Sequence, residues 1–497
     1  FNKEFEPIKK SNADAVFKNK NHADVNWFSV NYNIGTWIDF GKHFGVDNSI
    51  YFAQTFCNST NDQEVILNIG TSGSIKIWIN DKLIYSEEEE RNNDMDTYKI
   101  PAKLYAGSNR ILLQIGASDI ARANFMLRKK KKKGNIIPGL TYERYKNDYN
   151  KKYDYKGELI PSKTEAELRK KIKENPKSLV YHILLSKKLL ANDYSKEARE
   201  VIDDAIKIGP DCSYLLFQKM LVYIKDQNRT ALSEALESMR KIDPTNVLSL
   251  NMDYDEAKNA ENFTKCSEII SKLENKIGMT EDVYEKKISM AAIEKRIDDL
   301  LELNKAALKT YPDNYNFVEL QFRLEKEYHK NPSGAIKVLQ TFIKKNYHVT
   351  AMENLAQCYF ESGSSGFSKG MDILNKLATD QPNRAPSYNT LAGVYFAIKN
   401  FDAAEKCYQK CLEVAPFISS YNADLGLCYE QMSGRTDDAK KYYRMAIMFN
   451  PNDYETRANL RKLDGEKDVW DIFEVPETYT LFDKEYKKSD YPEDNSV

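Results

Sequence analysis

The hydrophobic pattern of the chain changes its period once. Up to about residue 128, apolar and polar side chains alternate, as in the runs 65–69, 75–79 and 111–115. Alternation with period two predicts strands that bury one face. From Thr164 onwards, apolar residues recur three and four positions apart, beginning with Ala166, Leu168 and Ile172. That spacing predicts amphipathic helices, so we expect a β-rich first part and a helical remainder.

Turn signals separate the expected strands. They are Gly70–Gly73, Asn80-Asp81 and Ala106–Asn109. Glycine and asparagine at such points favour tight turns. Several short strands joined in this way predict an antiparallel β-sandwich.

The helical part is a repeat. Pro176, Pro210 and Pro244 stand 34 residues apart, and further steps of 34 to 36 residues continue the series. The later positions are Gly278, Pro312, Asn346, Pro382, Pro416 and Pro451. A period near 34 over eight units predicts a solenoid of helix pairs.

We take the Pro, Gly or Asn that ends each repeat, from Pro210 to Pro451, as its closing position and count back from it. This count locates one face of each second helix, because residues three and four positions apart lie on the same face. Twelve residues before the closing positions stand Ala198, Leu232, Cys266, Leu300, Gly334, Gly370, Ala404 and Ala439. Eight before them stand Ile202, Leu236, Ile270, Asn304, Val338, Leu374, Tyr408 and Tyr443. Five before them stand Ala205, Met239, Leu273, Ala307, Thr341, Leu377, Cys411 and Ala446. We expect these residues to be the buried face.

The repeat resembles the tetratricopeptide repeat, a helix–turn–helix of 34 residues closed by Pro. Unit seven shows the motif best, from Tyr388 through Leu391, Ala392 and Tyr395, then Phe401, Ala404, Tyr408 and Cys411, to Pro416. Units two to five depart from the family, which has a small residue where they carry Met220, Tyr254, Ile288 and Phe322. The resemblance therefore implies a solenoid that is regular at its C-terminal end and irregular in the middle. Residues 452–463 are expected to form the polar capping helix.

In this family the first helices line a groove that holds an extended peptide or a partner's helix. The corresponding positions of the best-formed units are Thr350, Glu353, Gln357, Phe360, Asn389, Phe396, Ala423, Leu427 and Glu430. They form a mixed, apolar and slightly acidic surface. The Lys and Asn pair that some members use to clamp a carboxylate is missing from the matching positions. The alternative is that these residues only solvate a spacer between other domains.

The first part resembles the galactose-binding-like jelly roll. The likeness rests on residues 51–56, 68–82 and 106–112, with Asn80-Asp81-Lys82 where the family usually has Asn-Gly-Lys. The resemblance implies a jelly-roll β-sandwich and possible contact with glycan. The expected domains are a sandwich over 1–140, a linker over 141–163, the solenoid over 164–465, and a tail or linker to a further domain over 466–497.

The order of sandwich, repeats and a tail bearing Trp470 resembles the front half of Gram-negative envelope proteins that continue into a transglutaminase-like domain. This resemblance implies a place in the cell envelope, periplasmic or surface-exposed, with any such catalytic domain beyond Val497. The sequence shows no apolar run long enough to span a membrane.

Composition narrows the function classes. The formal net charge is −1 although 30% of residues are charged, which argues against binding to nucleic acid. The seven cysteines and five histidines lack metal-site spacing, and no phosphate-binding loop, zinc-protease motif or nucleophile elbow occurs. We therefore expect no catalytic residue, cofactor or metal within this chain, and we expect the cysteines to be buried fillers.

The leading hypothesis is a non-catalytic protein-interaction scaffold of the cell envelope, in which the repeats bind a protein and the sandwich orients it or contacts glycan. Two alternatives remain. One is the regulatory front half of a transglutaminase-like envelope enzyme, and the other is a carbohydrate-binding module on a helical stalk.

Overall fold

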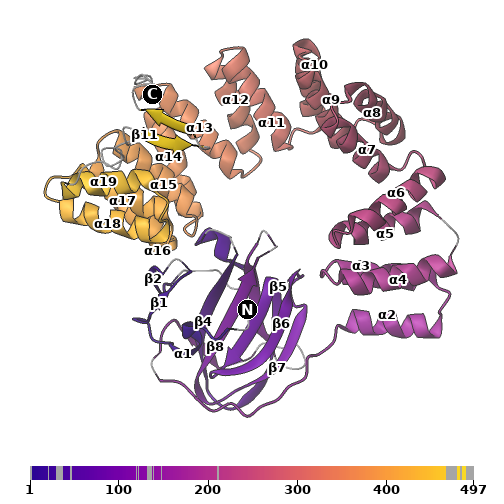
Figure 1. Ribbon diagram of the computed structural model, residues 1–497, viewed down its shortest axis with the longest axis horizontal. Helices are drawn as coiled ribbons and strands as arrows, with labels where there is room; N and C mark the ends of the chain where they lie inside the picture. The colour runs from indigo at the N-terminus through magenta and orange to yellow at the C-terminus, as the bar shows by residue number, and fades with distance from the viewer. Residues whose placement is uncertain are drawn as a thin grey trace. The chain divides into compact units, whose positions relative to one another are not determined.

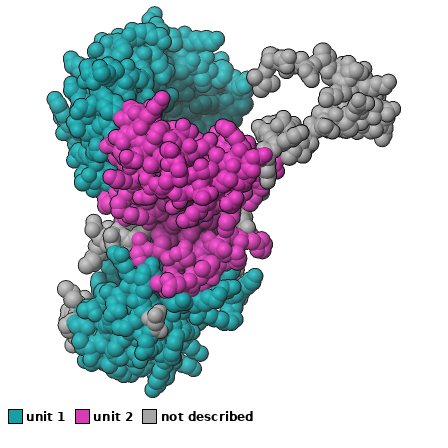
Figure 2. Space-filling view, turned by 90° about the vertical axis from the view of Figure 1, so that its left-hand side faces the viewer, with its two compact units in different colours: residues 1–12, 32–41, 46–381 teal, residues 13–31, 42–45, 382–497 magenta. Residues whose placement is uncertain are grey.

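The computed structural model describes residues 3–20, 22–29, 37–44, 48–118, 120, 122–130, 137, 139–146, 148–209 and 212–465, and the backbone of 478–481 and 484–487. These residues fall into two compact units, coloured separately in Figure 2. Unit 1 comprises residues 1–12, 32–41 and 46–381. Unit 2 comprises residues 13–31, 42–45 and 382–497.

Unit 1 contains the expected antiparallel β-sandwich (Figure 1). After the short helix α1 (Glu6–Lys9), its strands are β3 (Ile38–Asp39), β4 (Ser49–Ser59), β5 (Gln63–Ile79), β6 (Lys82–Asn92), β7 (Tyr98–Leu104), β8 (Gly107–Ala117), β9 (Asn124–Lys130) and β10 (Leu140–Glu143). The order of paired strands is β10-β4-β8-β5-β9-β3, and β6 and β7 also pair with β5. The antiparallel sandwich prediction is confirmed.

Strand β5 belongs to both layers. Its first half pairs with β7 and β9, and its second half pairs with β6 and β8. The turn predicted at Gly70–Gly73 is wrong, because these residues continue the ladder, with Gly70 opposite Met126. Gly73 has φ +122°, and a Cβ there would lie 2.5 Å from the carbonyl oxygen of Gly116. The glycines therefore serve a close approach of backbones at the point where the strand changes layers.

Of the other two turn signals, Asn80-Asp81 is confirmed, whereas only the first residue of Ala106–Asn109 lies in the connection, because Gly107 to Asn109 already pair with β4. Asn80 and Asp81 join β5 to β6 with φ values of 51° and 65°, the left-handed pair of a type I′ hairpin. Asp81 also pairs with Arg110, whose buried side chain lies 2.9 Å away and donates to the carbonyl oxygens of Pro7 and Ile8. Gly107, with φ +90°, comes directly after the short connection between β7 and β8.

The rest of unit 1 is a series of antiparallel helix pairs (Figure 1). After α2 (Lys163–Glu174), the pairs are α3 (Leu179–Leu190) with α4 (Ser195–Ile208), α5 (Ser213–Lys225) with α6 (Arg229–Ile242), α7 (Val247–Asn259) with α8 (Phe263–Ile277), α9 (Glu281–Ile293) with α10 (Ile297–Thr310), α11 (Tyr315–Arg323) with α12 (Pro332–Ile343), and α13 (Val349–Glu361) with α14 (Ser364–Asp380). Helical periodicity thus predicted these elements correctly.

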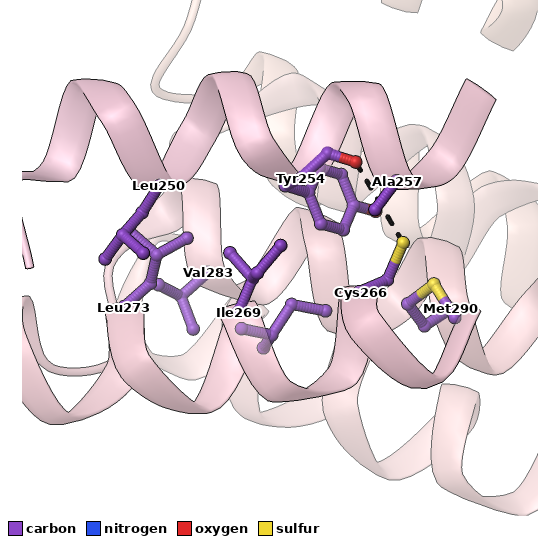
Figure 3. Packing of buried hydrophobic residues seen from close by; sticks show 9 residues of the cluster. Leu250, Tyr254, Ala257, Cys266, Ile269, Leu273, Val283 and Met290 are labelled. Atoms are coloured by element: carbon purple, nitrogen blue, oxygen red, sulfur yellow. Dashed lines mark hydrogen bonds between the residues drawn. The ribbon is translucent and has the colours of Figure 1, made fainter. Parts of the chain in front are cut away.

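Each repeat buries an apolar core between its two helices and the next first helix. Figure 3 shows one such cluster, in which Tyr254, Cys266 and Met290 come from α7, α8 and α9. The Sγ of Cys266 lies 4.0 Å from the carbonyl oxygen of Tyr254. Five of the seven cysteines are buried and Cys212 and Cys407 are half-buried, which confirms their use as small core residues.

The predicted irregularity of the middle repeats is confirmed. Within a pair, the two helices lie less close together along their length when the first helix carries a large residue. This holds for α5/α6, α7/α8, α9/α10 and α11/α12, compared with the pairs that have a small residue in the first helix. Those small residues include Ser186, Ala356, Ala392 and Gly426, and the large Met220, Tyr254, Ile288 and Phe322 are buried in the looser pairs. A large side chain between two helices holds their axes apart.

One part of the alignment is wrong by one residue. In α12 the buried residues are Ala335, Leu339 and Phe342, not the expected Gly334, Val338 and Thr341. Because the expected positions are counted back from Asn346, the mismatch arises between α12 and that residue. Helix α12 ends at Ile343, three residues before Asn346, whereas α6 and α10 end two residues before Pro244 and Pro312. Upstream of α12, residues Leu324–Tyr328 form a π-helical turn.

Unit 2 contains the last helices, α15 (Ala385–Ala397), α16 (Phe401–Val414), α17 (Ser419–Glu430), α18 (Thr436–Phe449) and α19 (Tyr454–Asp464). Helix α19 confirms the expected capping helix. The tail contributes an antiparallel hairpin of β11 (Thr478–Leu481) and β12 (Lys484–Lys487), which the pattern did not predict. Trp470 lies outside the described residues.

Residues from the start of the chain also belong to unit 2, which the sequence did not indicate. They include the hairpin of β1 (Val16–Lys18) and β2 (Asp24–Asn26). Phe28 and Phe44 pack against Phe417. Their ring centroids lie 5.6 and 5.9 Å, respectively, from the ring centroid of Phe417. The Nδ1 of buried His43 lies 2.7 Å from the carbonyl oxygen of Val414. We call Phe28, Phe44 and Phe417 the aromatic cluster of unit 2.

Candidate partner-binding site and a hollow in the sandwich

Four of the predicted groove residues lie on α13 in unit 1. Thr350 and Gln357 are exposed, and Glu353 is half-buried. Phe360 is half-buried against α14, with its ring 5.6 Å from that of Phe367. Since Phe360 packs on the partner helix of its own repeat, the accessible part of this face is mainly polar.

The other five lie on α15 and α17 in unit 2. Leu427 is exposed, while Asn389 and Ala423 are half-buried. Phe396 packs edge-on against Phe401 at 5.5 Å. The hydroxyl of Tyr443 donates to Glu430 at 2.7 Å. Phe396 and Glu430 therefore hold helices together, and Leu427 is the most exposed apolar side chain of the set.

The prediction missed Asp424, which neighbours Ala423 on α17. Burial raises the pKa of its carboxyl group, and the charge of Glu455 on α19 raises it further, whereas a hydrogen bond from Asn389 on α15 lowers it. The Oδ1 of Asn389 has no hydrogen-bond partner. Helices α15, α17 and α19 thus bring polar groups together, although these residues are more than thirty positions apart in the sequence.

A second surface missed by the prediction lies on α3 and α5. Val180 and Leu184, one turn apart on α3, are 61% and 47% exposed, and Tyr214 on α5 is 47% exposed. The Nζ of Lys187 lies 5.6 Å from the centre of the Tyr214 ring and joins the two helices. We call Val180, Leu184 and Tyr214 the α3–α5 apolar surface. Counting the groove positions in the first two repeats would have found Val180 and Tyr214, which follow Pro176 and Pro210 by four residues as Thr350 follows Asn346, but not Leu184.

The sandwich contains a hollow of about 650 Å³. The described residues that line it are Trp37, Ser72, Asn92, Asn93, Arg122 and Asn124. Asn92, Ser72 and Asn124 form one row across β6, β5 and β9, because Ser72 pairs with both of the others. No local sequence pattern indicated this hollow, since the row joins residues far apart in the chain.

The rim of this hollow is tied to the first repeat. The backbone N–H of Asn92 donates to Asp193 Oδ2 at 2.7 Å, and that of Asp94 donates to Asn192 Oδ1 at 3.1 Å. The guanidinium of Arg91 lies 4.4 Å from the centre of the Tyr194 ring. These three residues, Asn192 to Tyr194, form the turn between α3 and α4, so the sandwich and the first helix pair share a polar junction.

Among the described residues, no group of three His, Cys, Asp or Glu side chains is arranged to hold a metal ion. Within the residues that the structure describes, no helix is long and apolar enough to cross a membrane. Two of the histidines, His182 and His348, make structural contacts with their neighbours. His182 Nδ1 lies 2.9 Å from the carbonyl oxygen of Ser178, and His348 stacks on Tyr315 at 3.9 Å.

The fold defines a β-sandwich followed by repeated helix pairs, and comparison with known proteins agrees with the repeats. Residues 383–447, in unit 2, match the tetratricopeptide repeat family. The chain is 26% identical over 153 residues to the photosystem I assembly protein Ycf3 of Synechococcus, covering 27% of this chain and 88% of that protein. It is 24% identical over 113 residues to a protein O-mannosyl-transferase of Caenorhabditis elegans, of which it spans only 15%.

Solved structures give similar matches. One is the MamA protein, with 24% identity, a TM-score of 0.28, and coverage of 36% of this chain and 96% of that chain. Another is a thermophilic tetratricopeptide repeat protein of Thermus thermophilus, with 20% identity, a TM-score of 0.28, and coverage of 37% and 98%.

Proposed function

We propose that this chain is a protein-interaction scaffold whose first helices bind a partner protein. The observation that carries the proposal is the α3–α5 apolar surface, where adjacent first helices expose large apolar side chains instead of burying them. Exposed apolar groups that gather on one face are typical of protein-binding sites. The match of residues 383–447 to tetratricopeptide repeats supports the same role.

The partner-binding residues of the proposal are Val180, Leu184 and Tyr214 in unit 1, and Leu427 with its neighbours Asn389 and Ala423 in unit 2. Thr350, Glu353 and Gln357 would add polar contacts from α13. Phe360, Phe396 and Glu430 act instead by holding those helices in place, since each is engaged by a neighbouring helix.

The setting that we propose is an assembly of the cell envelope. It rests on the resemblance of the sandwich, the repeats and the tail to envelope proteins, and the sandwich would orient the bound protein or contact glycan. The proposal assigns no catalysis to these residues. A regulatory role beside a transglutaminase-like domain and a carbohydrate-binding module on a helical stalk are the alternatives.

The test is affinity capture by the full chain from the native envelope, with quantitative mass spectrometry. Leu184→Asp and Leu427→Asp place a charge on the proposed surfaces without filling a core. The matched control is Ile242→Asp, because Ile242 is similarly exposed, at 44%, but ends a second helix. We expect at least one of the first two variants to reduce capture about tenfold or more, as for a residue at the centre of an interface.

Equal capture by wild type, Leu184→Asp, Leu427→Asp and Ile242→Asp would contradict the proposed surfaces. Loss with Ile242→Asp alone would place the interface on the second helices and would contradict them as well.

A further inference from the structure

We propose that Lys129, at one end of the sandwich core, is a covalent modification site that forms an imine with uncharged aldehydes. The residues that carry this inference are Lys129 on β9 and Tyr142 on β10, with Cys57 on β4 beside them. None of them belongs to the surfaces proposed to bind a protein, so the inference is independent of the proposed function.

The first argument is the direction of the Lys129 side chain. Lys129 lies opposite Leu67 in the ladder of β9 and β5, and Leu67 is 0% exposed. Cross-strand partners point to the same face of a sheet, so Lys129 points toward the apolar core. Its neighbours Arg128 and Lys130 point to the other face, where both pair with Asp96. One of three consecutive cations is therefore directed inwards.

The second argument is the set of groups around the amine. The Nζ of Lys129 lies 4.2 Å from the centre of the Tyr142 ring. Tyr142 lies opposite buried Cys57 in the ladder of β10 and β4, so the amine reaches from one layer of the sandwich to the other. Lys129 is half-buried and Tyr142 is 56% exposed, so a small molecule can approach the amine beside the ring.

The third argument is that the amine has no acidic partner. Within the described residues, no carboxylate forms an ion pair with Lys129. Lys219 on α5 is the matched comparison, because it is also half-buried and lies 5.5 Å from the centre of the Tyr223 ring. The Nζ of Lys219, however, lies 2.9 Å from Asp203. The two lysines thus share an aromatic neighbour and differ in the carboxylate.

This difference acts on the protonation of the two amines. Burial lowers the pKa of Lys129, and the charge of the Cys57 thiolate opposes this only in part. Burial also acts to lower the pKa of Lys219, but the hydrogen bond and the charge of Asp203 outweigh it, so that pKa is raised. A larger share of Lys129 is therefore neutral at pH 7, and the neutral amine is the nucleophile.

The reaction needs only this amine and an aldehyde. The lone pair of Nζ attacks the carbonyl carbon, and one electron pair of the C=O bond moves to the oxygen. The resulting carbinolamine loses water, which carries away the carbonyl oxygen and both hydrogens of the neutral amine, and a C=N bond remains. Nothing is oxidised or reduced. An uncharged aldehyde is favoured, because a charged one would lose hydration beside the apolar core.

The experiment traps imines on the full chain with propanal and sodium cyanoborohydride, at low conversion. Mass spectrometry after chymotryptic digestion then quantifies labelling of Lys129 and Lys219 between about pH 6 and pH 11. The borohydride only makes the adduct permanent. Glyoxylate replaces propanal as the charged aldehyde. The variants are Tyr142→Glu, which places a carboxylate beside the amine, and the matched control Tyr142→Phe, which keeps the ring.

We expect propanal to label Lys129 about tenfold faster than Lys219 at pH 7, the ratio for a difference of about one pKa unit. The ratio should fall as the pH rises, because both amines become neutral. Tyr142→Glu should slow labelling of Lys129 about tenfold, and Tyr142→Phe by less than about twofold. Labelling of Lys219 should stay the same in both variants, which checks that they fold.

Equal labelling of Lys129 and Lys219 at pH 7 would overturn the proposal. A preference that does not change with pH would reflect access alone, and a preference that persists in concentrated urea would reflect the local sequence; either result would overturn it too. Faster labelling of Lys129 by glyoxylate than by propanal would contradict the uncharged class of aldehyde. Unchanged labelling of Lys129 in Tyr142→Glu would show that the surroundings of the amine do not control its reactivity.

Discussion

Asp424 is a carboxyl group that the fold places in an unfavourable environment. Burial and the neighbouring charge of Glu455 raise its pKa. An acid whose pKa is higher in the folded than in the unfolded state lowers stability once it ionises. The loss begins as the pH rises through the unfolded-state pKa and is complete above the folded-state pKa.

We therefore predict that Asp424→Asn is more stable than wild type at pH 7, by about 1 kcal/mol. The new amide removes the buried charge and can donate to the Oδ1 of Asn389, which has no partner. The gain should vanish below about pH 4, where Asp424 is protonated in both states. Urea denaturation at both pH values measures it.

The control is Asp255→Asn, because Asp255 is exposed on α7. This change should alter stability by less than about 0.5 kcal/mol at either pH. A gain from Asp424→Asn that persists unchanged at low pH would show that ionisation is not its cause.

At the scale of single residues, only part of the candidate site could be predicted from the sequence. The alignment placed Asn389, Ala423 and Leu427 on first helices, because groove positions are set by the repeat. It could not show that Phe360, Phe396 and Glu430 are engaged by neighbouring helices, since those contacts depend on side-chain direction. Asp424 and the row Asn92–Ser72–Asn124 depend on pairings across distant residues, which no local pattern encodes.

At the scale of elements, the spacing of a helix pair depends on one residue of its first helix. In α17 that residue is Gly426, and a Cβ there would meet the ring of Tyr443 on α18 at 2.7 Å. Gly393, on α15, has nothing within 4 Å of its hypothetical Cβ. Both glycines are in the interior of a helix, so they form a matched pair.

We predict that Gly426→Ala destabilises unit 2 by about 1–3 kcal/mol, because overfilling a packed contact displaces Tyr443. Gly393→Ala should instead stabilise it by about 0.5–1 kcal/mol, since alanine is the better helix former. Thermal and chemical denaturation of the full chain compare the two. Stabilisation by both alanines would mean that α17 and α18 can separate at no cost.

The elements themselves were largely predictable. Period and turn signals placed the strands and the helix pairs, because burial on one face fixes those periods. The errors have separate local causes. Gly70 and Gly73 permit a close approach of backbones where β5 changes layers, not a turn, and the connection between α12 and Asn346 differs by one residue from that of repeats such as α5/α6.

At the scale of the whole chain, sequence order does not match the compact units. Residues 13–31 and 42–45 belong to unit 2 together with residues 382–497. The packing that holds them there is the aromatic cluster, with Phe28 5.7 Å from Phe44 and 5.6 Å from Phe417. Such pairing cannot be read from periodicity, because nothing in residues 13–31 specifies a partner nearly 400 positions away.

The cluster predicts an energetic link between the two ends of unit 2. In a double-mutant cycle on the full chain, Phe28→Ala and Phe417→Ala should together cost less than the sum of their separate effects. The expected coupling is about 0.5–1.5 kcal/mol, the usual value for an edge-on aromatic pair.

The control pairs Phe28→Ala with Phe342→Ala, because Phe342 lies in the core of repeat five in unit 1. These two changes have no shared partner, so their effects should add within about 0.5 kcal/mol. Additivity of Phe28→Ala with Phe417→Ala as well would show that the start of the chain is not part of the C-terminal fold. Coupling confined to the first pair would mean that the last repeats depend for stability on a segment that precedes the sandwich.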